Sequence, residues 1–194
     1  MNRETTKIFT SMVVSSWVLF TAATFLADVG RGFVKDDFSW VASARDGLTN
    51  PKQILVPSQA GFYRPLVTAS FAVNFEFAEL APRAYGLTNL VLYALCAVGI
   101  AMLIRQLGLP WTSVLVGTFA WAINPHGIGM AVLWISGRTA LLLTLTSVLS
   151  TLAFLRGYRF VGLTFFAAAL LSKEEAVILP VDSCECAARR SRGE

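Results

Sequence analysis

The sequence predicts an all-α protein, a bundle of transmembrane helices with one or two further helices lying on the membrane surface. Of its 194 residues, 55% are hydrophobic, and the mean hydropathy is +0.61. Only 14% are charged, whereas a soluble domain carries about a quarter. Several apolar runs approach the roughly 20 residues that cross a bilayer. The alternating pattern of barrel strands does not appear, so we expect a polytopic helical membrane protein.

Five apolar runs are expected to span the membrane, and turns or basic residues separate them. Arg3 and Lys7 precede the first run, so the positive-inside rule predicts a cytoplasmic N-terminus. We interpret this run as an uncleaved anchor, because Asp28 follows it without a clear A-x-A cleavage site. The expected spans are residues 8–27, 85–104, 111–123, 139–155 and 160–171.

Two segments after the first span are predicted to be interfacial helices. Residues 36–48 place apolar side chains at helical spacing behind an acidic pair, Asp36 and Asp37, which is typical of a surface helix. Asn50 and Pro51 are expected to end this helix. Residues 65–80 are apolar but short, and they contain two glutamates. We favour a second interfacial helix there, with a short span as the alternative.

Composition argues against nucleic-acid and metal-binding classes. The net charge of +4 does not indicate a nucleic-acid partner, because many basic residues lie beside the apolar runs. Cys184 and Cys186 form a lone C-x-C, and His126 is the only histidine, so no metal site is predicted. No cofactor is firmly implied, although a divalent metal stays open.

Alternation of the spans sorts the charged residues into two sets. The set expected on the cytoplasmic side is Arg3, Lys7, Arg105, Arg156, Arg159 and the terminal arginines. The set expected on the opposite side is Asp36, Asp37, Arg64, Arg138, Lys173, Glu174 and Glu175. Cations gathered there could hold a phosphate, and a carboxylate could deprotonate a hydroxyl group.

Each residue of the second set also has an ordinary interpretation. Asp36 or Asp37 could cap a helix. Arg64 and Arg138 could bind lipid headgroups, and Lys173 and Glu174 could form a local ion pair at a helix end. Asn124 and its following proline could be a plain turn.

An ordered set of short motifs resembles the polytopic glycosyltransferases of the GT-C type. The similarity is greatest to the protein O-mannosyltransferases and the tetratricopeptide-containing transmembrane O-mannosyltransferases, and it covers about residues 8–181. The motifs are Asp36-Asp37, Tyr63-Arg64-Pro65-Leu66, Leu87-Thr88-Asn89-Leu90, Asn124-Pro125, Trp134-Ile135-Ser136-Gly137-Arg138 and Leu171-Ser172-Lys173-Glu174.

The resemblance implies a many-helix fold, GT-C-like, whose first extracytoplasmic loop carries membrane-lying helices. An acidic residue of that loop would act as, or near, the catalytic base. Asp36 or Asp37 would be the base, and the donor phosphate would lie near Arg64, Arg138 and Lys173. Supporting residues would be Glu174, Asn124 and Tyr63. The partners would be a polyprenyl- or dolichyl-phosphate sugar, with mannose as the candidate, and a protein, lipid or glycan acceptor. The membrane would be the bacterial inner membrane or the endoplasmic reticulum.

The chain departs from this family in three ways. Tyr93 stands where the branch often has a histidine, and residues 126–137 lack the acidic residue that often follows Asn-Pro. Family members continue for further spans, whereas residues 182–194 form a polar basic tail, so we expect a truncated or frameshifted product. The alternative is a non-catalytic polytopic membrane protein: an inactive remnant, an assembly subunit or a small transporter.

Overall fold

The computed structural model describes residues 23–26, 29–58, 61–124 and 130–179, together with Met12, Ser16 and Phe20. Within these ranges every regular element is helical, which confirms the all-α prediction. The elements are α2 (Asp37–Thr49), η2 (Pro51–Leu55), α3 (Pro65–Ala78), α4 (Pro82–Gln106), α5 (Trp111–Ala122), α6 (Met130–Leu133), η4 (Ile135–Gly137), α7 (Arg138–Leu155), α8 (Arg159–Leu170) and η5 (Glu174–Ile178).

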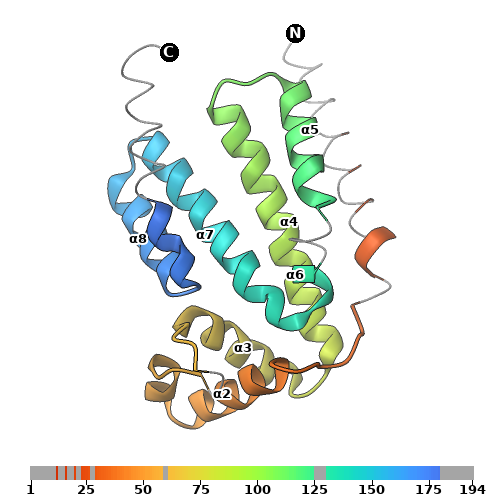
Figure 1. Cartoon of the computed structure of the whole chain (residues 1–194), viewed down its shortest axis with the longest axis vertical. Coiled ribbons are helices and arrows are strands. Elements are labelled where there is room, and N and C mark those ends of the chain that lie inside the picture. The colour runs from red at the N-terminus through yellow and green to blue at the C-terminus, as the bar shows by residue number, and fades with distance from the viewer. Residues whose placement is uncertain are drawn as a thin grey trace.

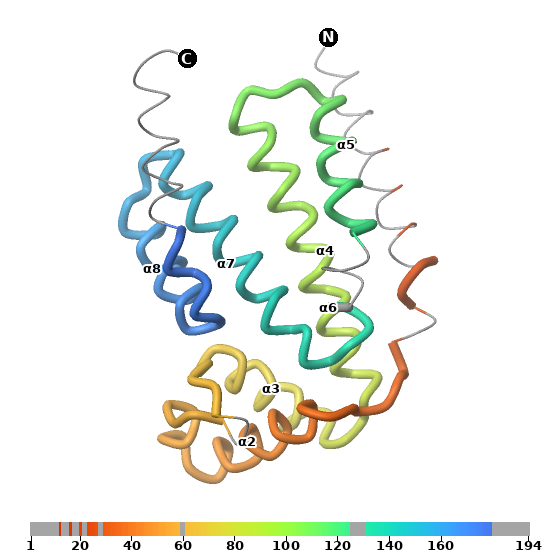
Figure 2. The backbone as a smooth tube through the Cα atoms, viewed as in Figure 1, coloured from red at the N-terminus to blue at the C-terminus, as the bar shows by residue number. Residues whose placement is uncertain are grey.

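The helices form an upright bundle closed at one end by a crossing layer (Figure 1). Helices α4, α5, α7 and α8 run along the long axis, with α7 packed against both α4 and α8. Helices α2 and α3 pack on each other and lie across the lower end. The segment before α2 passes the lower end of α4 (Figure 2), where the Val29 backbone lies against Gly86. We call α2 and α3 the crossing layer.

Two of the described helical segments, Pro82–Gln106 and Ile135–Leu155, are long and apolar enough to cross a membrane. In their most apolar stretches only 28% and 44% of the residues are buried, unlike the core helix of a soluble protein. Helices α5 and α8 have 12 residues each, so each is only about 18 Å long. The first predicted span, 8–27, lies largely outside the described residues.

Prolines and glycines set the helix boundaries. Pro65 and Pro82 occupy the first positions of α3 and α4, where a missing N–H costs nothing. Helix α4 therefore begins three residues earlier than its apolar run predicts. Asn50 ends α2 in an extended conformation and accepts a hydrogen bond from the Lys52 amide, at 3.2 Å. At the upper end, Gly108 and Gly157 adopt φ of 83° and 84° in the turns after α4 and α7.

An aromatic cluster attaches the crossing layer to the bundle. The rings of Trp40 and Phe71 stack with their centroids 6.1 Å apart, and Phe71 also contacts Tyr85, at 5.7 Å. All three side chains are buried, together with Ile135 near the start of α7. The start of α2 is therefore fixed against the lower ends of α4 and α7, which places the acidic pair beside the bundle.

Candidate functional site

A pocket of ≈ 350 Å³ opens where the crossing layer meets the bundle. Its charged lining residues are Asp36, Arg64 and Lys173, three of the five residues predicted to act on substrate. They are the residues that immediately precede α2, α3 and η5. We call this space the charged pocket. Its lining is Asp36, Trp40, Phe62, Arg64, Ala131, Trp134, Ser136, Gly137, Thr139, Ala140 and Lys173.

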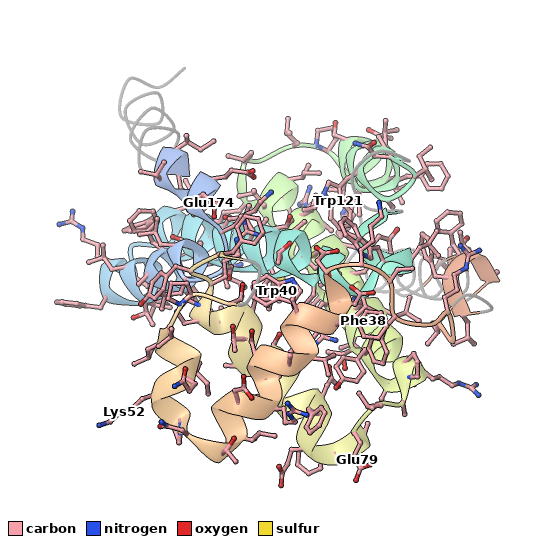
Figure 3. All side chains as sticks on the ribbon, turned by 60° about the horizontal axis from the view of Figure 1, so that its bottom comes forward. Phe38, Trp40, Lys52, Glu79, Trp121 and Glu174 are labelled. Atoms are coloured by element: carbon pink, nitrogen blue, oxygen red, sulfur yellow. The ribbon has the colours of Figure 1, made fainter. Side chains whose placement is uncertain are left out.

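Side chains as sticks locate this region within the fold (Figure 3). Trp40 lies between the crossing layer and the bundle, while Lys52 and Glu79 project from the outer side of the layer. Trp40 is only 1% exposed, whereas Phe62 is 43% exposed. The pocket therefore has a buried aromatic floor and a more accessible aromatic rim.

The two consecutive aspartates point to different surroundings. Asp36 is half-buried and lines the charged pocket. It occupies the N-cap position of α2 but makes no capping hydrogen bond through its side chain, so the capping interpretation is wrong for Asp36. Asp37 is fully buried. Its Oδ1 accepts hydrogen bonds from the Ser136 amide, at 2.7 Å, and from the Ser136 hydroxyl, and its Oδ2 accepts one from the Val34 amide, at 2.8 Å.

Arg138 is buried behind the pocket rather than among its lining residues. Its side chain is 0% exposed. Nε donates to Asn89 Oδ1 at 2.8 Å, Nη1 to the Ser70 carbonyl at 3.1 Å, and Nη2 to the Tyr85 carbonyl at 3.0 Å. The guanidinium also lies 4.4 Å from the centroid of the Phe71 ring. Arg138 therefore joins α7 to α3 and α4, which is a structural task that its position in the sequence did not reveal.

Asn89 completes this buried network. Its Nδ2 donates to the carbonyls of Ala131, Trp134 and Ile135, at 3.2, 3.3 and 3.1 Å. These carbonyls belong to the turn that leads into α7 and forms one wall of the charged pocket. Gly137 lies so close to the Ala131 backbone that an added Cβ would be 2.7 Å from the Ala131 oxygen. We call the set Asp37, Asn89, Ser136 and Arg138 the polar junction.

The pocket cations are paired with carboxylates of η5. Arg64 donates from Nε and Nη2 to the two carboxylate oxygens of Glu174, at 3.2 and 2.7 Å. Lys173 lies 2.8 Å from Glu175. The hydrogen bond from Arg64 holds the pKa of the Glu174 carboxyl below its ordinary range, and the charges of Arg64 and Lys173 act in the same direction. Glu174 itself is largely exposed, with 67% of its side chain accessible.

The remaining predicted residues lie away from the lining. Tyr63 is exposed beside Arg64, and Asn124 is exposed just after α5. His126 lies outside the described residues. Within the described ranges no group of three or more His, Cys, Asp or Glu side chains could hold a metal ion.

Reasoning from the sequence missed Trp40, Trp134, Ser136 and Gly137 as lining residues. The last three fall inside one of the quoted motifs, so the motif held a signal for them. For Trp40 the sequence held no such signal, apart from its position early in a predicted helix.

Comparisons with known proteins add no family to this description. No family model, curated protein or solved structure matches the chain. The residues of the charged pocket and the polar junction are therefore the only guide to function within the part of the chain that the structure describes. Together they offer a carboxylate, two cations and several aromatic side chains within one space. These groups suit the binding of an anionic, partly apolar ligand and the removal of a proton from it or from its partner.

Proposed function

We propose that the chain belongs to a membrane glycosyltransferase and that the charged pocket is its reaction site. The enzyme would transfer a sugar, with mannose as the candidate, from a polyprenyl- or dolichyl-phosphate donor to a hydroxyl acceptor on the extracytoplasmic face. The observation that supports this most is the convergence of Asp36, Arg64 and Lys173 on one pocket from three separate segments. The motif resemblance described above supplies the donor class.

The location of the pocket fits a lipid-linked donor. It lies where the start of α7 and the turn before it meet the crossing layer, and the segment Ile135–Leu155 is a candidate span. A polyprenyl chain could stay in the bilayer while its phosphate reaches the pocket at the bilayer edge. The opposite end of the bundle carries the turns after α4 and α7 (Figure 1), with Arg105 in the last turn of α4 and Arg156 after α7. The positive-inside rule predicts that this end is cytoplasmic.

In the proposed transfer, each charged side chain of the pocket has one task. Asp36 accepts the proton of the acceptor hydroxyl as its oxygen attacks the anomeric carbon of the sugar. The bond between that carbon and the phosphate oxygen breaks, and the electron pair leaves with the polyprenyl phosphate. The phosphate passes from one negative charge to two, which nearby cations stabilise most strongly at the transition state. Arg64 and Lys173 provide these cations, and arginine can hold a phosphate with two parallel hydrogen bonds.

Donor binding requires an exchange of partners at Arg64. The guanidinium already holds the Glu174 carboxylate in the two-point geometry that a phosphate would use. Because Glu174 is largely exposed, giving it up to solvent costs little. The same pairing favours the alternative of a non-catalytic membrane protein, in which the ion pair of Arg64 with Glu174 only holds η5 against α3.

Reconstituted protein can separate the two functions. The full chain, in phosphatidylcholine vesicles, is given polyprenyl-phosphate mannose labelled in the sugar and a peptide rich in Ser and Thr. We expect label in the peptide, and Asp36→Asn should reduce kcat by about 10²- to 10⁴-fold, the usual contribution of a general base. Asp46→Asn is the matched control, since it removes a carboxylate from α2 outside the pocket. If the wild-type chain neither binds the donor nor labels the peptide, the chain is a non-catalytic membrane protein and the proposal fails.

A further inference from the structure

The two aspartates at the start of α2 lie in different environments, one in the charged pocket and the other in the protein interior. Asp36 lines the charged pocket, whereas Asp37 is fully buried and absent from the lining. Consecutive residues of a helix point about 100° apart, so the two side chains leave α2 in different directions. Both oxygens of Asp37 are already engaged by N–H or O–H donors, from Ser136 and Val34. An acceptor hydroxyl in the pocket would meet Asp36 and not Asp37.

The partner of Asp37 is part of the pocket wall. Ser136 lines the pocket with Trp134 and Gly137, in a short turn whose carbonyls Asn89 holds from the side of α4. Asp37 holds the same turn from the side of α2 through both the amide and the hydroxyl of Ser136. The bonds of Asp37 therefore set how far the start of α2 lies from the opposite wall. Since Asp36 is the adjacent residue, they also set where its carboxylate stands in the pocket.

We propose that the two aspartates divide the work: Asp36 is the base, and Asp37 is a positioning residue that fixes the pocket wall through Ser136. The role of Asp36 as base rests on the proposed function, whereas the positioning role of Asp37 does not. The sequence alone left either Asp36 or Asp37 as the catalytic base, and the proposal assigns this role to Asp36. Asp37 also supplies a negative charge near the buried Arg138, with which it interacts favourably, so its charge has a structural reason independent of catalysis.

Three substitutions distinguish a base from a positioning residue. Asp36→Asn removes the proton acceptor and should lower kcat by about 10²- to 10⁴-fold. Asp37→Asn keeps an amide oxygen that can accept both bonds from Ser136, but its NH2 group cannot accept the bond from the Val34 amide. We therefore expect kcat to stay within about tenfold of wild type, which corresponds to the one hydrogen bond lost. Asp37→Leu has a similar size but no acceptor, and it should raise KM and lower kcat together because the wall is released. Rescue by asparagine at position 37 but not at position 36 is the expected pattern.

The pH profile of Ser136→Ala provides a second readout. If Asp37 were the base, losing the Ser136 hydroxyl would move the acidic limb of kcat/KM to higher pH, because a hydrogen bond to a carboxylate favours its ionised form. With Asp36 as the base, the limb should stay in place while kcat/KM falls by about two- to tenfold. An upward shift of the limb overturns the proposal, as does an Asp37→Asn variant that is as inactive as Asp36→Asn.

Hydrogen exchange tests the positioning role without any activity. We expect Asp37→Leu to speed exchange of the Ser136 amide by more than about tenfold, because the buried bond that protects it is lost. Asp37→Asn and Asp36→Asn should leave its rate within about threefold of wild type. Continued protection in Asp37→Leu overturns the positioning role. If the wild-type chain shows no transfer, the proposed function and the role of Asp36 as base fail, while the exchange result still decides the role of Asp37.

Discussion

The polar junction and the charged pocket are built from the same kinds of side chain but differ in what surrounds them. In the junction, Arg138 and Asp37 are fully buried, and each is hydrogen-bonded to residues of other elements. In the pocket, Arg64 keeps an exposed carboxylate as its partner, and Asp36 stands at the edge without a capping bond. Arg64 is itself only 8% exposed, so the exposure of the partner, rather than residue type, decides which charges hold the fold and which can meet a ligand.

This difference predicts opposite effects of substitution in the two regions. Junction residues should matter for stability, because a buried partner left alone loses its hydrogen bonds without gaining water. Pocket residues should matter for ligand binding, because their partners can return to solvent. Each variant below tests whether the two regions separate in this way.

The largest effect is expected for Arg138→Gln. The shorter glutamine side chain cannot donate hydrogen bonds to all three acceptors, on Asn89, Ser70 and Tyr85. The substitution also leaves Asp37 without a compensating positive charge. Breaking a buried charge network in this way costs about 3–5 kcal/mol. Denaturant unfolding of the purified protein in detergent measures the loss. Arg83→Gln, in an exposed arginine of α4, is the control and should change stability by less than about 0.5 kcal/mol. Equal stabilities of the two variants would show that the junction is not structural.

A smaller effect is expected for Gly137→Ala, which affects both regions. The added Cβ would approach the Ala131 backbone, 2.7 Å from its oxygen, so the turn that forms the pocket wall must shift. Overpacking of this kind costs about 1–3 kcal/mol. The shift should also weaken ligand binding, which vesicle binding of polyprenyl phosphate measures. Gly30→Ala is the matched control, because a Cβ there meets nothing within 4 Å. Wild-type stability in Gly137→Ala would contradict the close packing of this wall.

Much of this architecture could be predicted from the sequence because it follows local rules. Apolar runs located α4 and α7, and Pro65 marked the start of α3, whereas Pro82 was not recognised as the start of α4. Span alternation grouped Asp36, Arg64 and Lys173, which line one pocket in the structure. What could not be predicted depends on contacts between distant residues. The pairing of Arg64 with Glu174 joins positions 110 residues apart.

The direction of single side chains was equally hidden from the sequence. Asp36 and Asp37 look interchangeable as a sequence motif, and only the packing of α2 against the turn before α7 separates them. Arg138 reads as a membrane-edge cation, whereas three acceptors and an aromatic ring enclose it in the fold. Charge patterns thus grouped three residues that line the charged pocket but did not separate their roles from those of the buried residues.

For Glu174→Gln we expect a gain in ligand binding with little change in stability. The neutral amide competes less well than a carboxylate for Arg64, so polyprenyl phosphate in vesicles should bind about three- to tenfold more tightly, the value of one charge-assisted bond at an exposed site. Unfolding stability should fall by no more than about 1 kcal/mol. The control is Glu79→Gln, in an exposed residue on the outer side of the crossing layer. Weaker binding by Glu174→Gln would mean that Glu174 helps to hold the ligand.

The smallest effect concerns pH and the pair of Arg64 with Glu174. Because the hydrogen bond from Arg64 lowers the pKa of Glu174 in the folded state, the pair stabilises the fold fully above the ordinary glutamate pKa of about 4.3. Its contribution is lost as the pH falls through the lower pKa of the folded state. The stability difference between wild type and Glu174→Gln should therefore be constant from pH 7 to about 5 and shrink below about 4.3. Over the same interval, phosphate binding by the wild type should approach that of the variant, because protonated Glu174 releases Arg64. If wild type and Glu174→Gln still differ in phosphate binding by the same factor below about pH 4.3, the Glu174 carboxylate does not control the access of ligand to Arg64.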